Sequence, residues 1–187
     1  MTREDAMSRQ PASDETASRD HVDRIRQQWA RELPDLDTAP MEVLGRAYRL
    51  ARLVTPSIEA TFAAYGLDRG EFDVIATLRR AGPPYRLTPT ELYRTLMIAS
   101  GSLTHRLSRL EQAGLVRRVP SQQDGRSLVV ELTSEGQHRA EAAFRQDMAN
   151  EASFMATLEP RKRAQLAALL RELNLAVEAR LAEKPVD

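Results

Sequence analysis

The amino-acid sequence predicts a mainly α-helical chain that carries one small β-hairpin. Apolar residues recur at three- and four-residue steps through most of the chain, as they do at Leu44, Ala47, Tyr48 and Ala51. Two short Val-rich segments, 116–119 and 127–132, interrupt this period and flank an Asp-Gly turn signal. Helical spacing then resumes and continues for about 50 residues, so the fold class is α+β with few strands.

The N-terminal part divides into a tail, a short helix and a long helix. Residues 1–20 are polar and contain no apolar run, which predicts a disordered tail and no secretory signal. A helix over 21–31 carries the chain's single tryptophan, Trp29. Two prolines and two aspartates within 33–40 predict a connector to the long helix, which begins near Met41.

Start and stop signals subdivide the middle of the chain. Pro56 lies inside the periodic pattern of the long helix and predicts a kink or a local break, and Gly66 ends that helix. Asp68 is a good N-cap for the next helix, and Thr88-Pro89-Thr90-Glu91 combines an N-cap, a first-turn proline and a capping box. Ser100 is a further N-cap. We therefore expect three helices, over 68–80, 88–97 and 102–113.

The C-terminal part contains two long helices. Thr133 or Ser134 is expected to cap a helix over 135–154, and Pro160 to open the last one. That last helix carries an apolar stripe that we interpret as core or as a dimer seam, formed by Leu166, Leu169, Leu170, Leu173, Val177 and Leu181.

Composition excludes several classes of protein. The 187 residues include no cysteine, so disulfides, thiol redox switches and cysteine zinc sites are excluded. The chain has no Gly-rich phosphate loop, no His-Glu-x-x-His and no Gly-x-Ser-x-Gly, and we expect no catalytic residue, no metal site and no cofactor. No apolar run approaches the ~20 residues of a membrane span, and we expect the protein in the cytoplasm.

The order of elements predicts a winged helix-turn-helix that binds double-stranded DNA. Three helices precede a hairpin, and the second helix of such a helix-turn-helix pair enters the major groove. Charge supports this: residues 85–126 hold seven arginines and three acidic residues, although the whole chain has 27 basic and 27 acidic residues. The candidate DNA-binding residues are Thr88, Ser100, Ser102, Thr104, His105, Arg106, Ser108, Arg109, Arg118, Asp124 and Arg126.

Three segments carry a resemblance to one family of regulators. They are 72–82 (Phe-Asp-Val-Ile-Ala-Thr-Leu-Arg-Arg-Ala-Gly), 87–92 (Leu-Thr-Pro-Thr-Glu-Leu) and 106–118. Asp124-Gly125-Arg126 followed by Leu132-Thr133-Ser134-Glu135-Gly136 also matches the family's wing pattern. The chain resembles MarR-family transcription regulators over about residues 41–181. The resemblance implies a homodimer with intertwined first and last helices, a wing arginine (Arg126) in the minor groove, and a wing aspartate (Asp124) that orients it.

The N-terminal helix narrows the resemblance to members with an extra leading helix, including urate-responsive ones. In that branch a Trp, an Asp and an Arg form or support a ligand pocket, and the matching positions are Trp29, Asp73 and Arg106. The implied function is a repressor that a small aromatic anion releases from a pseudo-palindromic operator. The alternative function is a constitutive repressor that binds no ligand. The alternative role of Arg106 is to contact DNA and no ligand.

These interpretations give a four-part organisation of the chain. We expect a tail over 1–20, an extra helix and first dimerisation helix over 21–66, a DNA-binding lobe over 67–133, and dimerisation helices over 134–187.

Overall fold

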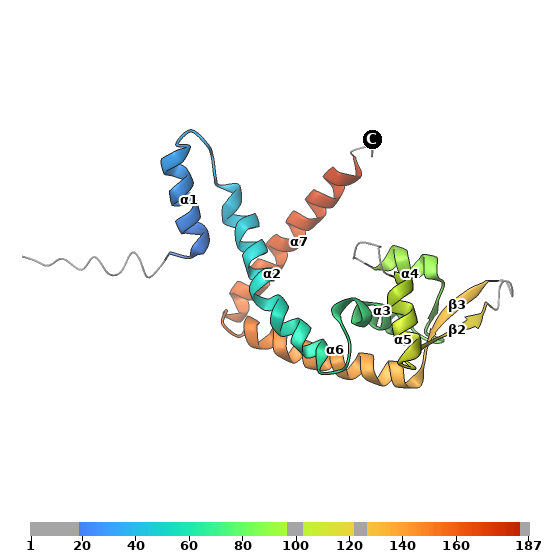
Figure 1. Cartoon of the computed structure of the whole chain (residues 1–187). Coiled ribbons are helices and arrows are strands. Elements are labelled where there is room, and N and C mark those ends of the chain that lie inside the picture. Colours follow the sequence, from blue (N-terminus) through green and yellow to red (C-terminus); the bar gives the residue numbers. More distant parts are fainter. Residues whose placement is uncertain (1–18, 97–102, 122–126, 184–187) are drawn as a thin grey trace, which may run out of the picture. The chain divides into compact units, whose positions relative to one another are not determined.

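The computed structural model describes residues 19–96, 103–121 and 127–183, and its contacts divide the chain into two units, 1–56 and 57–187. Helices provide most of the described residues, and three strands form one small antiparallel sheet (Figure 1). The predicted fold class, mainly α with a β-hairpin wing, is therefore confirmed. The helices are α1 (His21–Glu32), α2 (Pro40–Ala63), α3 (Arg69–Arg80), α4 (Pro89–Thr95), α5 (Leu103–Gln112), α6 (Ser134–Met155) and α7 (Pro160–Ala182).

The first unit consists of α1 and the first two-thirds of α2. Asp20 and Asp23 form the capping box of α1, and Arg46 of α2 donates to both carboxylates, at 2.7 and 2.6 Å. These bonds lower the pKa of Asp20 to about 2. Val22 is buried and lies within van der Waals reach of the Cα face of Gly45, so α1 is both ion-paired and packed onto α2.

Helix α2 runs through Pro56 without interruption, so the local break expected there is absent. Thr55 and Thr61 donate their hydroxyls to carbonyl oxygens four residues earlier, as side chains inside a helix commonly do. Gly66 adopts a φ of 69°, a value that glycine tolerates best, and it ends the run as expected.

Helix α3 lies at the centre of the second unit, where it contacts α4, α5, α6 and β3. Asp68 caps α3 in a reciprocal capping box with Glu71, as the sequence predicts. One side of α3 is buried against α6, and Phe72 of α3 also stacks on Phe62 near the end of α2, with ring centroids 4.0 Å apart. The α3 residues of this core are fully or almost fully inaccessible to solvent: Phe72, Val74, Ile75 and Leu78.

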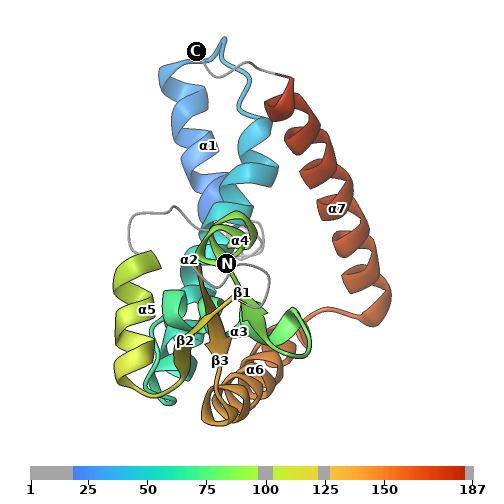
Figure 2. The ribbon, with the colours of Figure 1, turned by 90° about the vertical axis from the view of Figure 1, so that its right-hand side faces the viewer.

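The sheet has the order β1-β3-β2, with β3 in the middle (Figure 2). The two expected wing strands are present as β2 (Val116–Pro120) and β3 (Leu128–Leu132), paired antiparallel with Val116 opposite Leu132. Strand β1 (Arg86–Leu87) was not predicted; it pairs with Glu131 and Val130 of β3 and so attaches the start of α4 to the wing.

One threonine joins the wing to the helices on either side of it. The Thr133 hydroxyl accepts from Gly136 N at 3.0 Å and thereby caps α6. The same hydroxyl donates to the carbonyl oxygen of Gly114, at 2.8 Å, just beyond the end of α5. The base of the wing, the end of α5 and the start of α6 therefore meet at one side chain.

Candidate nucleic-acid interface

Helix α4 is held at its first turn by the capping box that the sequence predicts. The Thr88 hydroxyl accepts from Glu91 N at 3.1 Å and lies 2.8 Å from a Glu91 carboxylate oxygen. Leu92 is fully buried and fixes the helix to the lobe. The Thr88 hydroxyl, a candidate DNA contact, is thus already engaged in capping.

Helix α5 presents its outward face as expected for a recognition helix. Leu107 and Leu110 are buried, whereas Thr104 and His105 are exposed and Ser108 is half-buried. Ser100 and Ser102, the other candidates at this end, lie outside the described residues. An amphipathic helix whose polar side faces solvent leaves donors and acceptors available to base edges.

Arg109, expected to face DNA, is anchored on α3. Its Nε lies 2.9 Å from a Glu71 carboxylate oxygen, and its Nη1 lies 3.4 Å from Asp68. Glu71 is almost completely buried, so this ion pair sets the position of α5 against α3 more firmly than a surface pair would.

Arg106 also turns toward α3. Its guanidinium lies across Gly70 in the first turn of α3, one helical turn from Asp73. Burial raises the pKa of Asp73, and the charges of Arg69, Arg106 and Arg80 oppose that shift. The structure therefore brings two of the three candidate ligand residues, Asp73 and Arg106, into one electrostatic neighbourhood.

The third candidate ligand residue, Trp29, lies on α1 in the first unit and is 45% exposed. Its indole ring can therefore contact a partner molecule or a ligand.

Wing arginines form ion pairs that the sequence count did not include. Glu131 of the central strand lies directly opposite both Arg86 and Arg117, and its carboxylate oxygens lie 2.6 and 2.5 Å from them. Arg118 lies 3.5 Å from Glu111. Glu131 lies outside 85–126, so it partly compensates the net positive charge counted for that segment, whereas Glu111 lies inside it. Asp124 and Arg126 lie outside the described residues.

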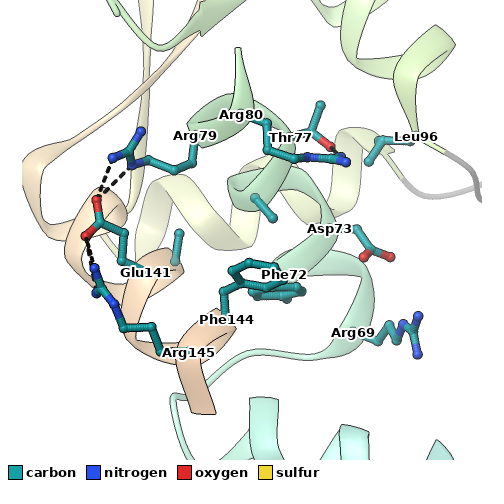
Figure 3. Close-up of a pocket in the computed structure, with 12 residues that line it drawn as sticks. Arg69, Phe72, Asp73, Thr77, Arg79, Arg80, Leu96, Glu141, Phe144 and Arg145 are labelled. Atoms are coloured by element: carbon teal, nitrogen blue, oxygen red, sulfur yellow. Dashed lines mark hydrogen bonds and ion pairs between the residues drawn. The ribbon is translucent and has the colours of Figure 1, made fainter. Parts of the chain in front are cut away.

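A pocket of about 820 Å³ opens between α3, the end of α4 and α6 (Figure 3). Phe72 and Phe144 line one side with aromatic rings, and Asp73 lies at the rim near Arg69. Glu141 accepts from Arg79 at 2.8 Å and lies 3.4 Å from Arg145. Aromatic walls, arginines and two carboxylates in a space of this size suit a small planar ligand with polar groups.

The sequence comparisons agree with this geometry. The model of the MarR family matches residues 65–127, from just after α2 through β2, and ends one residue before β3. The chain is 40% identical over 149 residues to the HTH-type transcriptional regulator PecS of Dickeya dadantii, covering 80% of this chain and 90% of PecS. The chain belongs to the MarR family. It is a DNA-binding transcription regulator, and the expectation that it is not an enzyme is confirmed by that membership.

Other MarR-family relatives and structures extend the match. The HTH-type transcriptional repressor Rv2887 of Mycobacterium tuberculosis is 31% identical over 141 residues, which cover 74% of this chain and 96% of Rv2887. The crystal structure of AbsC from Streptomyces coelicolor has a TM-score of 0.64 at 23% identity and covers 77% of this chain and 98% of AbsC. Wild-type MarR from Escherichia coli gives a TM-score of 0.54 at 27% identity, covering 70% and 96% of the two chains.

Two contacts in this MarR-family chain were missed by reasoning from the sequence. Gly70 and Glu71 were not singled out, yet they receive Arg106 and Arg109. The sequence shows a capping box at the start of α3 and two arginines three positions apart on α5. Neither pattern indicates that these two helices are in contact. The described helices include none that is long and apolar enough to cross a membrane.

Proposed function

We propose that this regulator is a homodimeric repressor that acts in the cytoplasm on a pseudo-palindromic operator. The carrying observation is the outward face of α5, whose exposed Thr104 and His105 lie beside a wing in a chain that is 40% identical to a known regulator. Two such helices related by a two-fold axis would read half-sites about 10 bp apart.

The last helix supports the proposed dimer. Within the described residues, α7 leaves most of its apolar stripe in solvent, and Leu169 is 64% exposed. Apolar area left in water disfavours the isolated chain, and a second copy would cover it. Residues 21–66 and 134–187 would supply the dimer contacts, leaving 67–133 as the DNA-binding lobe.

Binding of the purified chain to duplex DNA from its own upstream region, measured by fluorescence anisotropy, tests the proposal. With ~6–10 phosphate contacts, affinity should fall about 10³–10⁵-fold between 50 and 200 mM salt. Arg126→Ala should weaken binding, and Lys162→Ala, which removes a charge outside the lobe, should not. A flat salt response, or equal binding by both variants, would contradict the proposed interface.

We further propose that a small aromatic anion, urate among the candidates, relieves this binding. The pocket between α3 and α6 provides aromatic walls and Asp73. Arg106 is not among the residues that line this pocket, but its guanidinium lies at Gly70, one helical turn from Asp73, and is a planar group that pairs with carboxylate-like oxygens. By the resemblance stated above, Trp29 would stack on the ligand. A tenfold loss of operator affinity requires roughly 1.4 kcal/mol of coupling between ligand and DNA.

Quenching of the single tryptophan by urate tests the ligand proposal. Trp29→Phe should remove most of the emission that reports binding, so affinity in this variant is measured by calorimetry. Trp29→Ala and Arg106→Ala should each weaken urate binding by calorimetry. Unchanged affinity in both variants would discard the site. Unchanged operator binding at saturating urate would favour the alternative, a constitutive repressor.

A further inference from the structure

The first turn of α3 holds two arginines of the recognition helix in different ways. Arg109 is fixed by Glu71 and Asp68, at 2.9 and 3.4 Å. Arg106, one turn earlier on α5, lies flat against the backbone of α3 at Gly70. A Cβ placed on Gly70 would lie 2.6 Å from Arg106 Nη2 and closer still to Nε and Cζ, so only glycine leaves this space open.

Nothing in the described part of the chain locks Arg106 into this position. No hydrogen bond or ion pair to a described residue holds its guanidinium. Its guanidinium lies at the N-terminal end of α3, where a helix carries partial positive charge. Asp73, one turn along the same helix, provides the compensating charge. Shape rather than a strong bond therefore keeps Arg106 beside α3.

We propose that Gly70, by lacking a side chain, leaves a space on α3 that holds the Arg106 side chain away from the DNA-facing side of α5. We call this space the Gly70 seat, and the position of Arg106 in it the stowed position. Since Arg109 fixes the helix itself, Arg106 can leave the seat by side-chain rotation alone. Leaving would add one cation to the DNA-facing surface. Gly70 is thus a positioning residue that determines how many arginines the recognition helix presents. This inference rests on the proposed DNA binding, and its first test does not.

Gly70→Ala isolates the seat. The methyl group meets the far end of a flexible side chain, which can move away at little cost, and no backbone atom is among the closest atoms. Alanine also favours a helix over glycine. The variant should therefore fold with an unchanged or higher melting temperature while displacing Arg106.

Gly45→Ala is the matched control. Gly45 lies inside α2, and an added Cβ would meet Val22 at 3.5 Å, an ordinary contact. It introduces the same helix-favouring change without affecting Arg106.

The first readout is modification of Arg106 by phenylglyoxal in the full chain, followed by peptide mass spectrometry. We expect Arg106 to react several-fold faster in Gly70→Ala than in the wild type, and at the wild-type rate in Gly45→Ala. Arg109 should be unchanged in all three. Equal Arg106 rates in Gly70→Ala and the wild type would overturn the proposal, whether or not the protein binds DNA.

The second readout is stability in the absence of the Arg106 side chain. If Gly70→Ala lowers the melting temperature by crowding Arg106, then Arg106→Ala should cancel that loss in the double variant. A loss that persists in the double variant would mean that the methyl group strikes something other than Arg106, and the seat would be rejected.

The third readout is the salt dependence of DNA binding. One more phosphate contact steepens the slope of log affinity against log salt by about 0.9, which adds roughly three- to fourfold to the loss between 50 and 200 mM salt. We expect this for Gly70→Ala and a wild-type slope for Arg106→Ala. A wild-type slope in Gly70→Ala, or a shallower one in Arg106→Ala, would contradict the stowed position. Absence of any DNA binding by the wild type would instead refute the proposed function.

Discussion

The Nε atom of Arg109 lies 2.9 Å from a carboxylate oxygen of Glu71, and this contact joins the recognition helix to the helix that supports it. The other oxygen of Glu71 accepts from Asp68 N, also at 2.9 Å, to complete the capping box of α3. One buried carboxylate therefore serves both the start of α3 and the position of α5.

Glu71→Ala should lower the free energy of unfolding by about 1–3 kcal/mol, because it removes a cap and leaves Arg109 without its buried partner. Urea denaturation followed by circular dichroism measures this. Glu135→Ala, which removes an exposed carboxylate paired with Arg139 within α6, should cost less than about 0.5 kcal/mol. Similar losses of unfolding free energy in the two variants would show that the contact between Glu71 and Arg109 contributes no more to stability than an exposed ion pair does.

Acid should weaken the wing through Glu131. Burial would raise the pKa of this residue, but bonds from Arg117 and Arg86 outweigh it and hold the pKa below its usual 4.5. A lowered pKa contributes stability that is present above the unfolded value and is lost as pH falls through the folded one. Unfolding free energies between pH 7 and 3 should thus fall more steeply below pH 4.5 in the wild type than in Glu131→Gln. Parallel curves would contradict this assignment.

The pKa of Asp147 is shifted in the opposite direction to that of Glu131. It is 5% exposed, one of its oxygens has no partner among the described residues, and burial raises its pKa above 3.8 while Arg69 partly opposes the shift. An ionised carboxylate there disfavours folding at neutral pH, so Asp147→Asn should add about 1–2 kcal/mol at pH 7.

The gain from Asp147→Asn should shrink as pH falls toward 3.8 and Asp147 itself becomes protonated. Asp35→Asn, at an exposed site in the connector before α2, is the matched control and should leave stability at pH 7 unchanged. Destabilisation by Asp147→Asn at pH 7 would show that the ionised carboxylate makes an interaction that stabilises the folded chain.

Local signals explain what the sequence predicts well. The caps at Asp68, Thr88 and Thr133 each depend on residues three positions apart, and all three are present. The wing strands were predicted with boundaries correct to one residue because their Val-rich segments flank a turn. Pro56 is the exception: it predicts a kink or a local break, yet α2 continues through it without a break.

Contacts between distant segments explain what the sequence does not predict. Strand β1 has two residues, and its partner Glu131 lies 45 positions from Arg86. The ion pairs of Arg109 and Arg117 depend on how helices and strands meet, so a count of charge within one segment overstates the free positive charge. Gly70 has no side chain, so nothing in the sequence indicates that it lies against Arg106.

Gly136 should tolerate no side chain. A Cβ there would overlap the carbonyl oxygen of Leu115 and lie 2.7 Å from Leu132 Cδ1. Because a backbone atom cannot move as a side-chain tip can, Gly136→Ala should destabilise the chain by about 2–4 kcal/mol in urea denaturation. Gly45→Ala should be neutral or slightly stabilising. A neutral Gly136→Ala would mean that α6 can shift away from Leu115.

A charge on the apolar stripe of α7 should weaken the proposed dimer. Leu169→Glu places a carboxylate among apolar residues that a second chain would cover, so the dimer dissociation constant should rise tenfold or more, about 1.4 kcal/mol. Ala168→Glu, on the opposite side of the helix, should leave it unchanged. Sedimentation velocity over a concentration series measures both. Equal constants would place the interface elsewhere.

The hydroxyl of Thr133 has a consequence for how the wing can vary among relatives. It joins the root of the hairpin to the residue just beyond the end of α5 and to the first turn of α6, so the root cannot shift without breaking a helix cap. Insertions or deletions between Ser121 and Ser127 change the length of the hairpin but leave this junction intact. In the proposed interface, the length of the wing and the outward face of α5 can therefore diversify separately, each by its own mutations.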